Sequence, residues 1–327
     1  MKKLILTAAF VFCCFGRLSA SPDPALQQSF IAAKQLVDLS SDSAGPYQLD
    51  VDFVAQFSVP TQGRLTLKWE AKDRWWRRVV IGSFLEIQIK NGEWLYTVRN
   101  LDFTPTRIGD LISLLNLSAG TEDWVATNEK RRVENGTQMT CIRVERQGFK
   151  NRGHDVCLDD ASHEILVDEW QDSPDEHSRR QYSEYFDFGK HRFPRKLELL
   201  RDGSKVVTAN VVGLGPAPFD ESLLTPPPEA IARRECANRK PPLAIRDPSP
   251  TYPSAASNNR MTGDTIVAMT VQKDGSVSDI HLVGSAAHDM NDATLQVLKG
   301  WKFKPAMCGT EPVVSDITVI VSFRITN

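Results

Sequence analysis

The clearest chemical signal in the chain comes from its cysteines. Four of the six lie beyond the N-terminal export signal described below, and they are Cys141, Cys157, Cys236 and Cys308. An even number of thiols in an exported chain indicates disulfide bonds, and four thiols allow three pairings. Cys141 and Cys157 fit best, because each sits in a strand-like run on either side of a Gly/Asn-rich turn. That pairing leaves Cys236 to meet Cys308. A metal site is the weaker interpretation, since the four have no C-x-x-C spacing.

The other chemically active residue types form no catalytic pattern. The chain contains no phosphate-binding loop, no G-x-S-x-G and no H-E-x-x-H motif. The acidic residues around Pro174 are expected in a solvated loop. The pair Trp75-Trp76 could stack on a ligand, but we favour an edge strand whose indoles are half-buried. The histidines are scattered through polar stretches, where we expect surface side chains: His154, His163, His177, His191, His281 and His288. The sequence therefore predicts no enzyme, no cofactor and no metal site.

The N-terminus is typical of a cleaved export signal. Lys2 and Lys3 precede an apolar run at residues 4–16, and small residues lead up to a cleavage position after Ala20. The apolar run is shorter than the roughly 20 residues that a membrane-spanning helix needs. We therefore expect residues 1–20 to be removed and the product to be periplasmic. An inner-membrane anchor formed by residues 4–16 is the less favoured alternative.

The composition is that of a soluble globular protein. Of the 327 residues, 41% are hydrophobic and 24% are charged, and this length allows two domains. The formal net charge is −2, and loss of the three cations Lys2, Lys3 and Arg17 with the signal makes it −5. The basic excess that attracts nucleic acid is therefore missing.

Residues 25–212 are predicted to form an antiparallel, β-rich domain. Apolar residues recur at helical spacing over residues 25–39, which indicates an amphipathic helix, and a second, shorter helix is expected within the strand series. Strict alternation over residues 49–59 indicates a long strand with one apolar face, and Asn91-Gly92 marks a hairpin turn. We therefore predict an α+β chain whose first domain is a curved sheet or open barrel covered by its helices.

A proline-rich stretch and a small C-terminal domain follow. Residues 213–249 are predicted to form an extended, semi-rigid linker. Residues 250–327 then have the order strand, strand, helix, strand, with Asp274-Gly275 at the turn between the first two strands. The helical spacing covers residues 289–298, and β-branched residues fill the last strand. This order predicts a helix packed on one face of a three-stranded antiparallel sheet.

Several motifs of this last domain occur in an order and spacing typical of one family. They are Tyr252-Pro253, Gly263, Asp274-Gly275, Ser285, the helix, and the run Trp301-Lys302-Phe303-Lys304-Pro305-Ala306. With these motifs the domain resembles the C-terminal domain of the TonB family. The resemblance implies a periplasmic domain of a Gram-negative bacterium that binds outer-membrane transporters. In that family, a short N-terminal segment of the partner adds as a strand to the sheet edge.

The last strand is therefore expected to be the binding edge. An exposed edge offers unpaired N–H and C=O groups, so main-chain bonds can supply affinity without a catalytic residue. The expected partner is a TonB-dependent outer-membrane transporter or another envelope protein. The family's energy transducers carry a longer proline-rich spacer and an N-terminal membrane helix, so a role in energy-dependent transport depends on an anchor. The residues expected at the edge are Ile317, Val319, Val321, Phe323 and Ile325.

The first domain resembles a second family more weakly. The N-terminal helix, the long first strands and the aromatic stretch at residues 185–197 are similar to the periplasmic lipoprotein-carrier superfamily, whose LolA-like members enclose an apolar cavity. This resemblance implies an acyl-chain or lipoprotein ligand and gives an alternative function as a lipid carrier. A plain packed core is the other interpretation of the same pattern.

Overall fold

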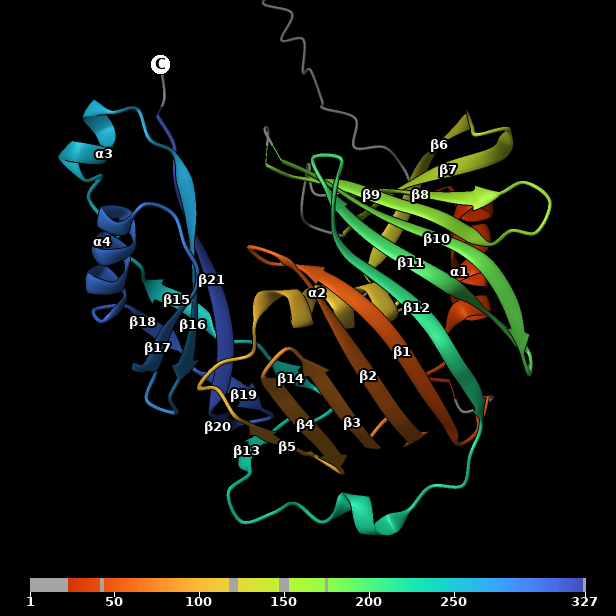
Figure 1. The fold of residues 1–327 in the computed structure, drawn as a ribbon, viewed down its shortest axis with the longest axis horizontal. Helices are drawn as coiled ribbons and strands as arrows, with labels where there is room; N and C mark the ends of the chain where they lie inside the picture. Colours follow the sequence, from red (N-terminus) through yellow and green to blue (C-terminus); the bar gives the residue numbers. More distant parts are fainter. Residues whose placement is uncertain (1–22, 42–43, 118–122, 147–152, 174–175, 326–327) are drawn as a thin grey trace, which may run out of the picture.

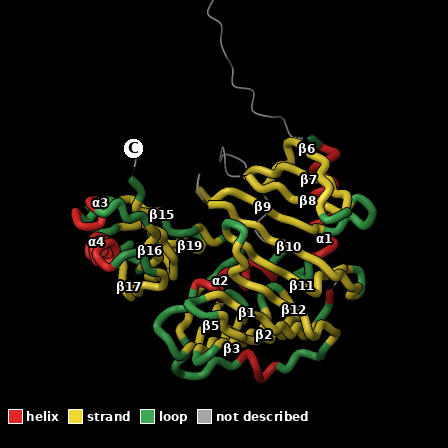
Figure 2. Tube along the Cα trace, turned by 45° about the horizontal axis from the view of Figure 1, so that its top comes forward, coloured by secondary structure: helices red, strands yellow, loops and turns green. Residues whose placement is uncertain are grey.

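The computed structural model describes residues 23–41, 44–117, 123–146, 153–173 and 176–325. The predicted signal at residues 1–20, with its cleavage after Ala20, lies outside these ranges. Among the described helices, none is both long and apolar enough to cross a membrane. A large curved sheet with covering helices and a smaller C-terminal unit lie side by side (Figures 1 and 2).

The larger part is a single antiparallel sheet, to which 13 of the described strands belong. The strand order is β13-β5-β4-β3-β2-β1-β12-β11-β10-β9-β8-β7-β6, which confirms the predicted curved sheet and does not close into a barrel (Figure 1). Two runs of consecutive strands therefore meet where β1 pairs with β12. The bounds are β1 (Tyr47–Gln56), β2 (Pro60–Ala71), β3 (Arg74–Ile81), β4 (Phe84–Asn91), β5 (Trp94–Arg99), β6 (Trp124–Glu134), β7 (Thr137–Arg146), β8 (Gly153–Asp159), β9 (Ile165–Ser173), β10 (Glu176–Phe188), β11 (His191–Arg201), β12 (Ser204–Pro216) and β13 (Ile231–Arg234).

Two helices, α1 (Pro24–Val37) and α2 (Thr106–Leu115), lie within the curve of this sheet (Figure 1). Asp23 caps α1, because its carboxylate accepts hydrogen bonds from the N–H groups of Ala25 at 2.9 Å and Leu26 at 3.2 Å. Both helices turn an apolar stripe to the sheet and share its core. The stripes consist of Phe30, Ala33 and Val37 on α1 and of Ile108, Leu111 and Leu114 on α2.

The strand with the two tryptophans is not an edge strand. Trp75 and Trp76 lie on β3, which pairs with β2 on one side and β4 on the other. The prediction of an edge was wrong because the hairpin β4–β5, turning at Asn91-Gly92 as predicted, continues the sheet beyond β3. Both indoles are half-buried, as expected.

Both predicted disulfides are present. Cys141 and Cys157 stand opposite each other on the neighbouring strands β7 and β8 and are bonded. Cys236, two residues after β13, is bonded to Cys308 at the end of β19 (Ala306–Cys308). The first bond therefore fixes a hairpin, and the second ties the segment between the two domains to the C-terminal unit.

The segment predicted to be a linker, residues 213–249, pairs first with the large sheet and then with strands of the C-terminal unit. It begins with the end of β12 and continues through a 3-10 helix, η2 (Glu221–Leu224), to β13, which pairs with β5 in the large sheet. It then pairs with C-terminal strands, as β14 (Arg239–Lys240) with β19 and as β15 (Leu243–Arg246) with β18 (Lys302–Lys304).

The C-terminal unit contains the predicted order of strand, strand, helix and strand. Its main sheet has the antiparallel order β17-β16-β21, and α4 crosses one face (Figure 2). A short strand, β20, extends the pairing of β14 with β19. The bounds are α3 (Ser254–Asn258), β16 (Gly263–Val271), β17 (Val277–Gly284), α4 (His288–Leu298), β20 (Glu311–Val313) and β21 (Ser315–Phe323).

Gly275 occupies the turn between β16 and β17. Its φ of +79° lies in the left-handed region, and a Cβ there would stand 1.9 Å from the carbonyl oxygen of Phe303. The turn is closed by Asp274, whose carboxylate accepts from the N–H of Ser276 at 2.9 Å. The carbonyl of Gly275 accepts from the N–H of Phe303 at 2.9 Å, so the hairpin and β18 are held together at this point.

Candidate functional site

Strand β21 forms one edge of the C-terminal sheet. It pairs with β16 over its whole length, from Ser315 opposite Val271 to Phe323 opposite Gly263. On its other side, no strand pairs with it in the described part of the chain. Its outward N–H and C=O groups are therefore the kind of edge to which a further strand can add.

The side chains of β21 alternate between the core and the opposite face. Ile317 and Val319 pack against the cluster around Leu298 of α4, while Val321 packs with Phe323, which is 3% exposed. Full burial of an apolar side chain of this size contributes roughly 1.5–3 kcal/mol to stability, and the half-buried Ile317, Val319 and Val321 contribute less than that. These four predicted residues thus anchor the strand and leave its backbone at the edge. The fifth, Ile325, lies two residues beyond the end of β21.

A buried amide fixes α4 on this sheet. Asn291 is 6% exposed, and its side-chain oxygen accepts from Thr265 Oγ1 at 3.0 Å and from the N–H of Ala286 at 3.1 Å. Its Nδ2 donates to Ser285 Oγ at 2.7 Å. Every polar atom of the Asn291 side chain therefore has a partner, as burial requires. Ser285, one of the motifs in the sequence, acts here as a partner for the helix.

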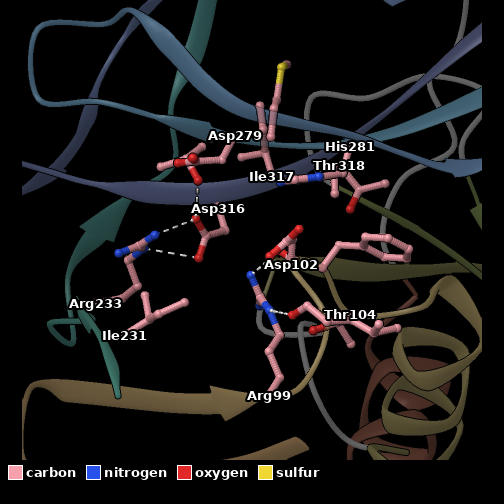
Figure 3. Close-up of a pocket in the computed structure, with 15 residues that line it drawn as sticks. Arg99, Asp102, Thr104, Ile231, Arg233, Asp279, His281, Asp316, Ile317 and Thr318 are labelled. Atoms are coloured by element: carbon pink, nitrogen blue, oxygen red, sulfur yellow. Dashed lines mark hydrogen bonds and ion pairs between the residues drawn. The ribbon is translucent and has the colours of Figure 1, made fainter. Parts of the chain in front are cut away.

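The beginning of β21 is tied to the large sheet. Arg233 of β13 donates to both carboxylate oxygens of Asp316, at 3.0 Å each (Figure 3). Thr270 Oγ1 donates to the same carboxylate at 2.8 Å. A bidentate arginine–carboxylate pair fixes orientation as well as distance. The sequence did not reveal this contact, because Arg233 lies in the segment predicted to be a linker.

The next arginine along β13 makes a second contact between the parts. Arg234 is ion-paired with Glu93 in the β4–β5 turn at 2.9 Å and also with Glu311 of β20. All three side chains are at least 30% exposed, so solvent screens these pairs and each adds little to stability. Together with the Arg233–Asp316 pair they connect β13 and the β4–β5 turn with the C-terminal unit.

A cavity of about 760 Å³ lies between the two parts. One wall is the face of the C-terminal sheet opposite α4, including Asp279, His281 and Thr318, and the other is β13 with residues 99–104 (Figure 3). The rings of Phe103 and His281 meet across it with centroids 6.1 Å apart. Residues 316–318 at the beginning of β21 therefore border the large domain, while residues 319–323 do not line this cavity.

A second cavity, of about 500 Å³, lies within the large domain between the sheet and its helices. Its volume falls in the range of about 300–1,000 Å³ that is usual for small-molecule sites. The apolar walls include Leu49, Leu65, Leu67, Trp69, Leu115 and Phe193. Sequence alternation predicted this apolar face but could not distinguish a cavity from a filled core.

A charge cluster around the buried Asp168 lies beside the helices, and it includes His154, which was expected at the surface and is half-buried. His154 Nδ1 is 2.6 Å from Asp168, and its ring stacks on Trp170 with centroids 4.6 Å apart. Arg180 donates to the same carboxylate at 2.8 Å. Burial opposes ionisation, but the His154 hydrogen bond and the nearby positive charges hold the pKa of Asp168 at about 2.

A second histidine that was expected at the surface, His191, is buried. His191 is 5% exposed, and its ring nitrogens lie 3.2 Å from the carbonyl of Gln35 and 3.3 Å from Ser41 Oγ. It connects β11 with the end of α1 and the loop that follows. Among the described residues, no group of three His, Cys, Asp or Glu side chains is placed to hold a metal ion.

The comparisons with known proteins agree with this architecture. Residues 248–325 match the family model described as Gram-negative bacterial TonB protein C-terminal, which confirms the predicted resemblance. The solution structure of the Pseudomonas aeruginosa TonB C-terminal domain is 27% identical, with 28% of this chain covering 93% of that one at a TM-score of 0.25. The chain is thus an α+β protein that carries a TonB-type C-terminal domain.

Other solved structures resemble more than half of the chain. A LolA superfamily protein from Nitrosomonas europaea is 9% identical, with 63% of this chain covering 98% of that one at a TM-score of 0.41. A chain from the Pseudomonas aeruginosa MucA/MucB complex is 12% identical, with 78% covering 76% at a TM-score of 0.28. At these TM-scores the similarities do not define a function. Among curated proteins, none matches this chain.

Proposed function

We propose that this protein is a periplasmic binding protein that captures an extended segment of an envelope partner at the free edge of β21. The observation that carries the proposal is the unpaired edge of β21 in a domain that matches the TonB C-terminal family. Strand addition supplies main-chain hydrogen bonds along such an edge. The expected partner is a TonB-dependent outer-membrane transporter or another envelope protein.

The accessible part of the edge is its second half. Asp316 at the beginning of β21 is held by Arg233, and Ile317 and Thr318 border the cavity between the domains. Residues 319–323 lie beyond these contacts, and Ile320 among them is 63% exposed. The partner strand is therefore expected to pair mainly with residues 319–323.

A pair of proline substitutions tests the edge. Proline removes an N–H donor, and successive N–H groups along a strand point to opposite edges. Of Val319→Pro and Ile320→Pro, one therefore removes a bond to β16, and the other removes a donor from the free edge. The free-edge variant should stay folded by circular dichroism and lose at least about tenfold in affinity for a transporter's N-terminal peptide, which corresponds to roughly 1.4 kcal/mol.

Ile320→Ala is the matched control, since it shortens an exposed side chain and leaves the backbone intact. It should bind the peptide like the parent chain. A folded proline variant that binds with unchanged affinity, measured by calorimetry, would exclude strand pairing at β21.

The cavity of the large domain supports a second candidate function. We propose that residues 25–212 carry an apolar ligand, the acyl chain of a lipid or lipoprotein, in the 500 Å³ cavity. The support is the apolar lining, which contains Leu65 and Phe193 from two separate parts of the sheet. Binding of a neutral long-chain ester to the purified protein tests this function.

A further inference from the structure

Arg77 is a buried cation of the large domain whose hydrogen-bond partners are incomplete among the described residues. It lies on β3, opposite Gln88 of β4, and its Nη2 donates to the Gln88 side-chain oxygen. Its Nε is enclosed and has no hydrogen-bond partner in the described part of the chain. No carboxylate of the described residues makes an ion pair with it; the acids nearest in effect are Glu86 and Glu235.

This guanidinium nevertheless keeps its charge. Burial lowers the pKa of Arg77 to about 10, while the negative charges of Glu86 and Glu235 act in the opposite direction. The group therefore stays protonated at neutral pH. A buried charge with an incomplete set of partners is unfavourable, and an anion that accepts its free N–H groups relieves that cost.

Arg77 stands where two cavities adjoin. It lines the cavity of about 500 Å³ with the leucine and aromatic walls, the apolar cavity, and also one of about 440 Å³ beneath α2 whose lining side chains are mostly polar or charged, the polar cavity. Ile112 and Asn116 line both as well. Arg180 also borders the polar cavity, but Asp168 already neutralises it at 2.8 Å. Lys72 also lines the apolar cavity but is exposed to solvent, so Arg77 is the buried cation that remains for an incoming anion.

The walls around Arg77 divide by polarity. Its guanidinium carbon lies 5.2 Å from the centre of the Trp75 ring, and its cross-strand neighbour on β2 is Leu67. On the other side, the polar cavity is lined by Glu86, Gln88 and Ser113, and the Glu86 carboxylate accepts a hydrogen bond from Thr104 Oγ1. A ligand in this position meets one positive charge at the boundary and an apolar space beyond it.

We propose that the cavity of the large domain takes an anionic amphiphile, with its carboxylate or phosphate head on Arg77 and its hydrocarbon chain in the apolar cavity. This assignment rests on the second candidate function and specifies its ligand class. The head makes charge-assisted hydrogen bonds to the guanidinium, and the chain contacts the leucine and aromatic walls.

Binding of three single-chain probes to the full mature protein, stripped of lipid, tests the assignment. Hexadecanoate and hexadecyl phosphate carry the two anionic heads, and methyl hexadecanoate is a neutral probe of similar length. Both anionic probes, or one of them, should bind at least about tenfold more tightly than the ester, because a hydrogen bond to a charged group has that effect. The anionic probe that binds more tightly shows whether the head group of the ligand is a carboxylate or a phosphate.

Arg77→Gln should abolish this preference, with a loss of about 10- to 100-fold for the anion and unchanged binding of the ester. Arg78→Gln is the matched control, since Arg78 is the next residue on the same strand and is exposed. It should bind all three probes like the parent chain. Unchanged ester binding also shows that the Arg77 variant is folded.

Each remaining outcome has a distinct meaning. Equal binding of ester and anions by the parent, or a preference that survives in Arg77→Gln, overturns the headgroup assignment and leaves the carrier function standing. Failure of all three probes to bind overturns the carrier function together with the assignment.

Discussion

The Asp168 carboxylate connects three strands beneath the helices. It is 4% exposed, and it bonds to His154 of β8 and Arg180 of β10 from its own place on β9. The Arg180 guanidinium also lies over the Trp170 ring, 4.6 Å from its centre. Removal of one partner from such a cluster leaves the others buried and uncompensated.

Asp168→Asn should therefore lower the free energy of unfolding by about 3–5 kcal/mol, because Arg180 would keep its charge without a counter-ion. The change is measured by urea denaturation at neutral pH. Asp155→Asn, on the neighbouring strand, is the control. Asp155 is 40% exposed and pairs with Arg143 at 3.3 Å, so its loss should cost about 0–1 kcal/mol. Equal effects of the two variants would contradict the importance of the buried cluster.

The same carboxylate predicts a dependence on pH. Its pKa falls from the ordinary value of 3.8 to about 2 in the folded protein. A depressed pKa means that the contribution is complete above the unfolded value and is lost as the pH falls through the folded value. The difference between parent and Asp168→Asn in the free energy of unfolding should thus be constant above about pH 5 and shrink between about pH 4 and pH 2. A constant difference over that range would exclude this linkage.

For individual residues, both cysteine pairs were predicted correctly from the sequence, but the prediction of surface positions was wrong for two histidines. Cys141 and Cys157 were recognisable because both strands of their hairpin alternate clearly. His154 and His191 were expected at the surface because their neighbours in sequence are polar. Strand alternation gives the better signal, since Val156 and Phe193, which are two residues after His154 and His191 and on the same strand faces, are buried.

At the scale of elements, the β16–β17 turn is the feature that constrains the C-terminal sheet most narrowly. Gly275→Ala places a methyl group 1.9 Å from the Phe303 carbonyl oxygen at a positive φ. We expect a loss of at least about 2 kcal/mol in the free energy of unfolding of this unit, from left-handed strain and the clash together. Thermal denaturation of the full chain measures it.

Gly309→Ala is the matched control within the same unit. Gly309 also has a positive φ, of +62°, but no atom lies within 4 Å of a Cβ built there. The strain alone should cost about 1 kcal/mol. If both alanine variants unfold at the same temperature, the contact between the turn and β18 has no special importance.

Most of these elements could be predicted, and the exceptions share one cause. Long strands and α4 have a clear period of alternation or helical spacing, so their order was readable. The strands β13, β14, β15 and β18 have four residues or fewer, and most of them lie among prolines. Such short runs have no period, and only their tertiary partners decide that they pair. In the same way, β3 is an inner strand because β4 pairs with it, which the residues of β3 alone do not reveal.

For the whole molecule, the contacts of β13 set how the two domains lie together. Arg233→Gln combined with Asp316→Asn removes the bidentate pair and leaves both sheets intact. The distribution of distances between spin labels on the two domains should broaden, while the unfolding temperature changes little because both side chains are partly exposed.

Lys205→Gln is the control, since Lys205 pairs with Glu198 on the surface of the large sheet, away from β13. It should leave the distance distribution unchanged. A double variant with the parent's narrow distribution would show that the remaining contacts of β13 suffice.

The disulfide between Cys236 and Cys308 has a mechanical consequence. It joins residues 72 apart in sequence, so tension applied to β21 has a covalent route to β13 that bypasses β16, β17 and α4. Cys308 precedes β21 by seven residues, and Cys236 follows β13 by two. If β21 captures a strand as proposed, a pull on that strand would reach the four-residue ladder between β13 and β5 without first unfolding the small domain. We therefore expect the β13–β5 ladder to separate before the small domain unfolds.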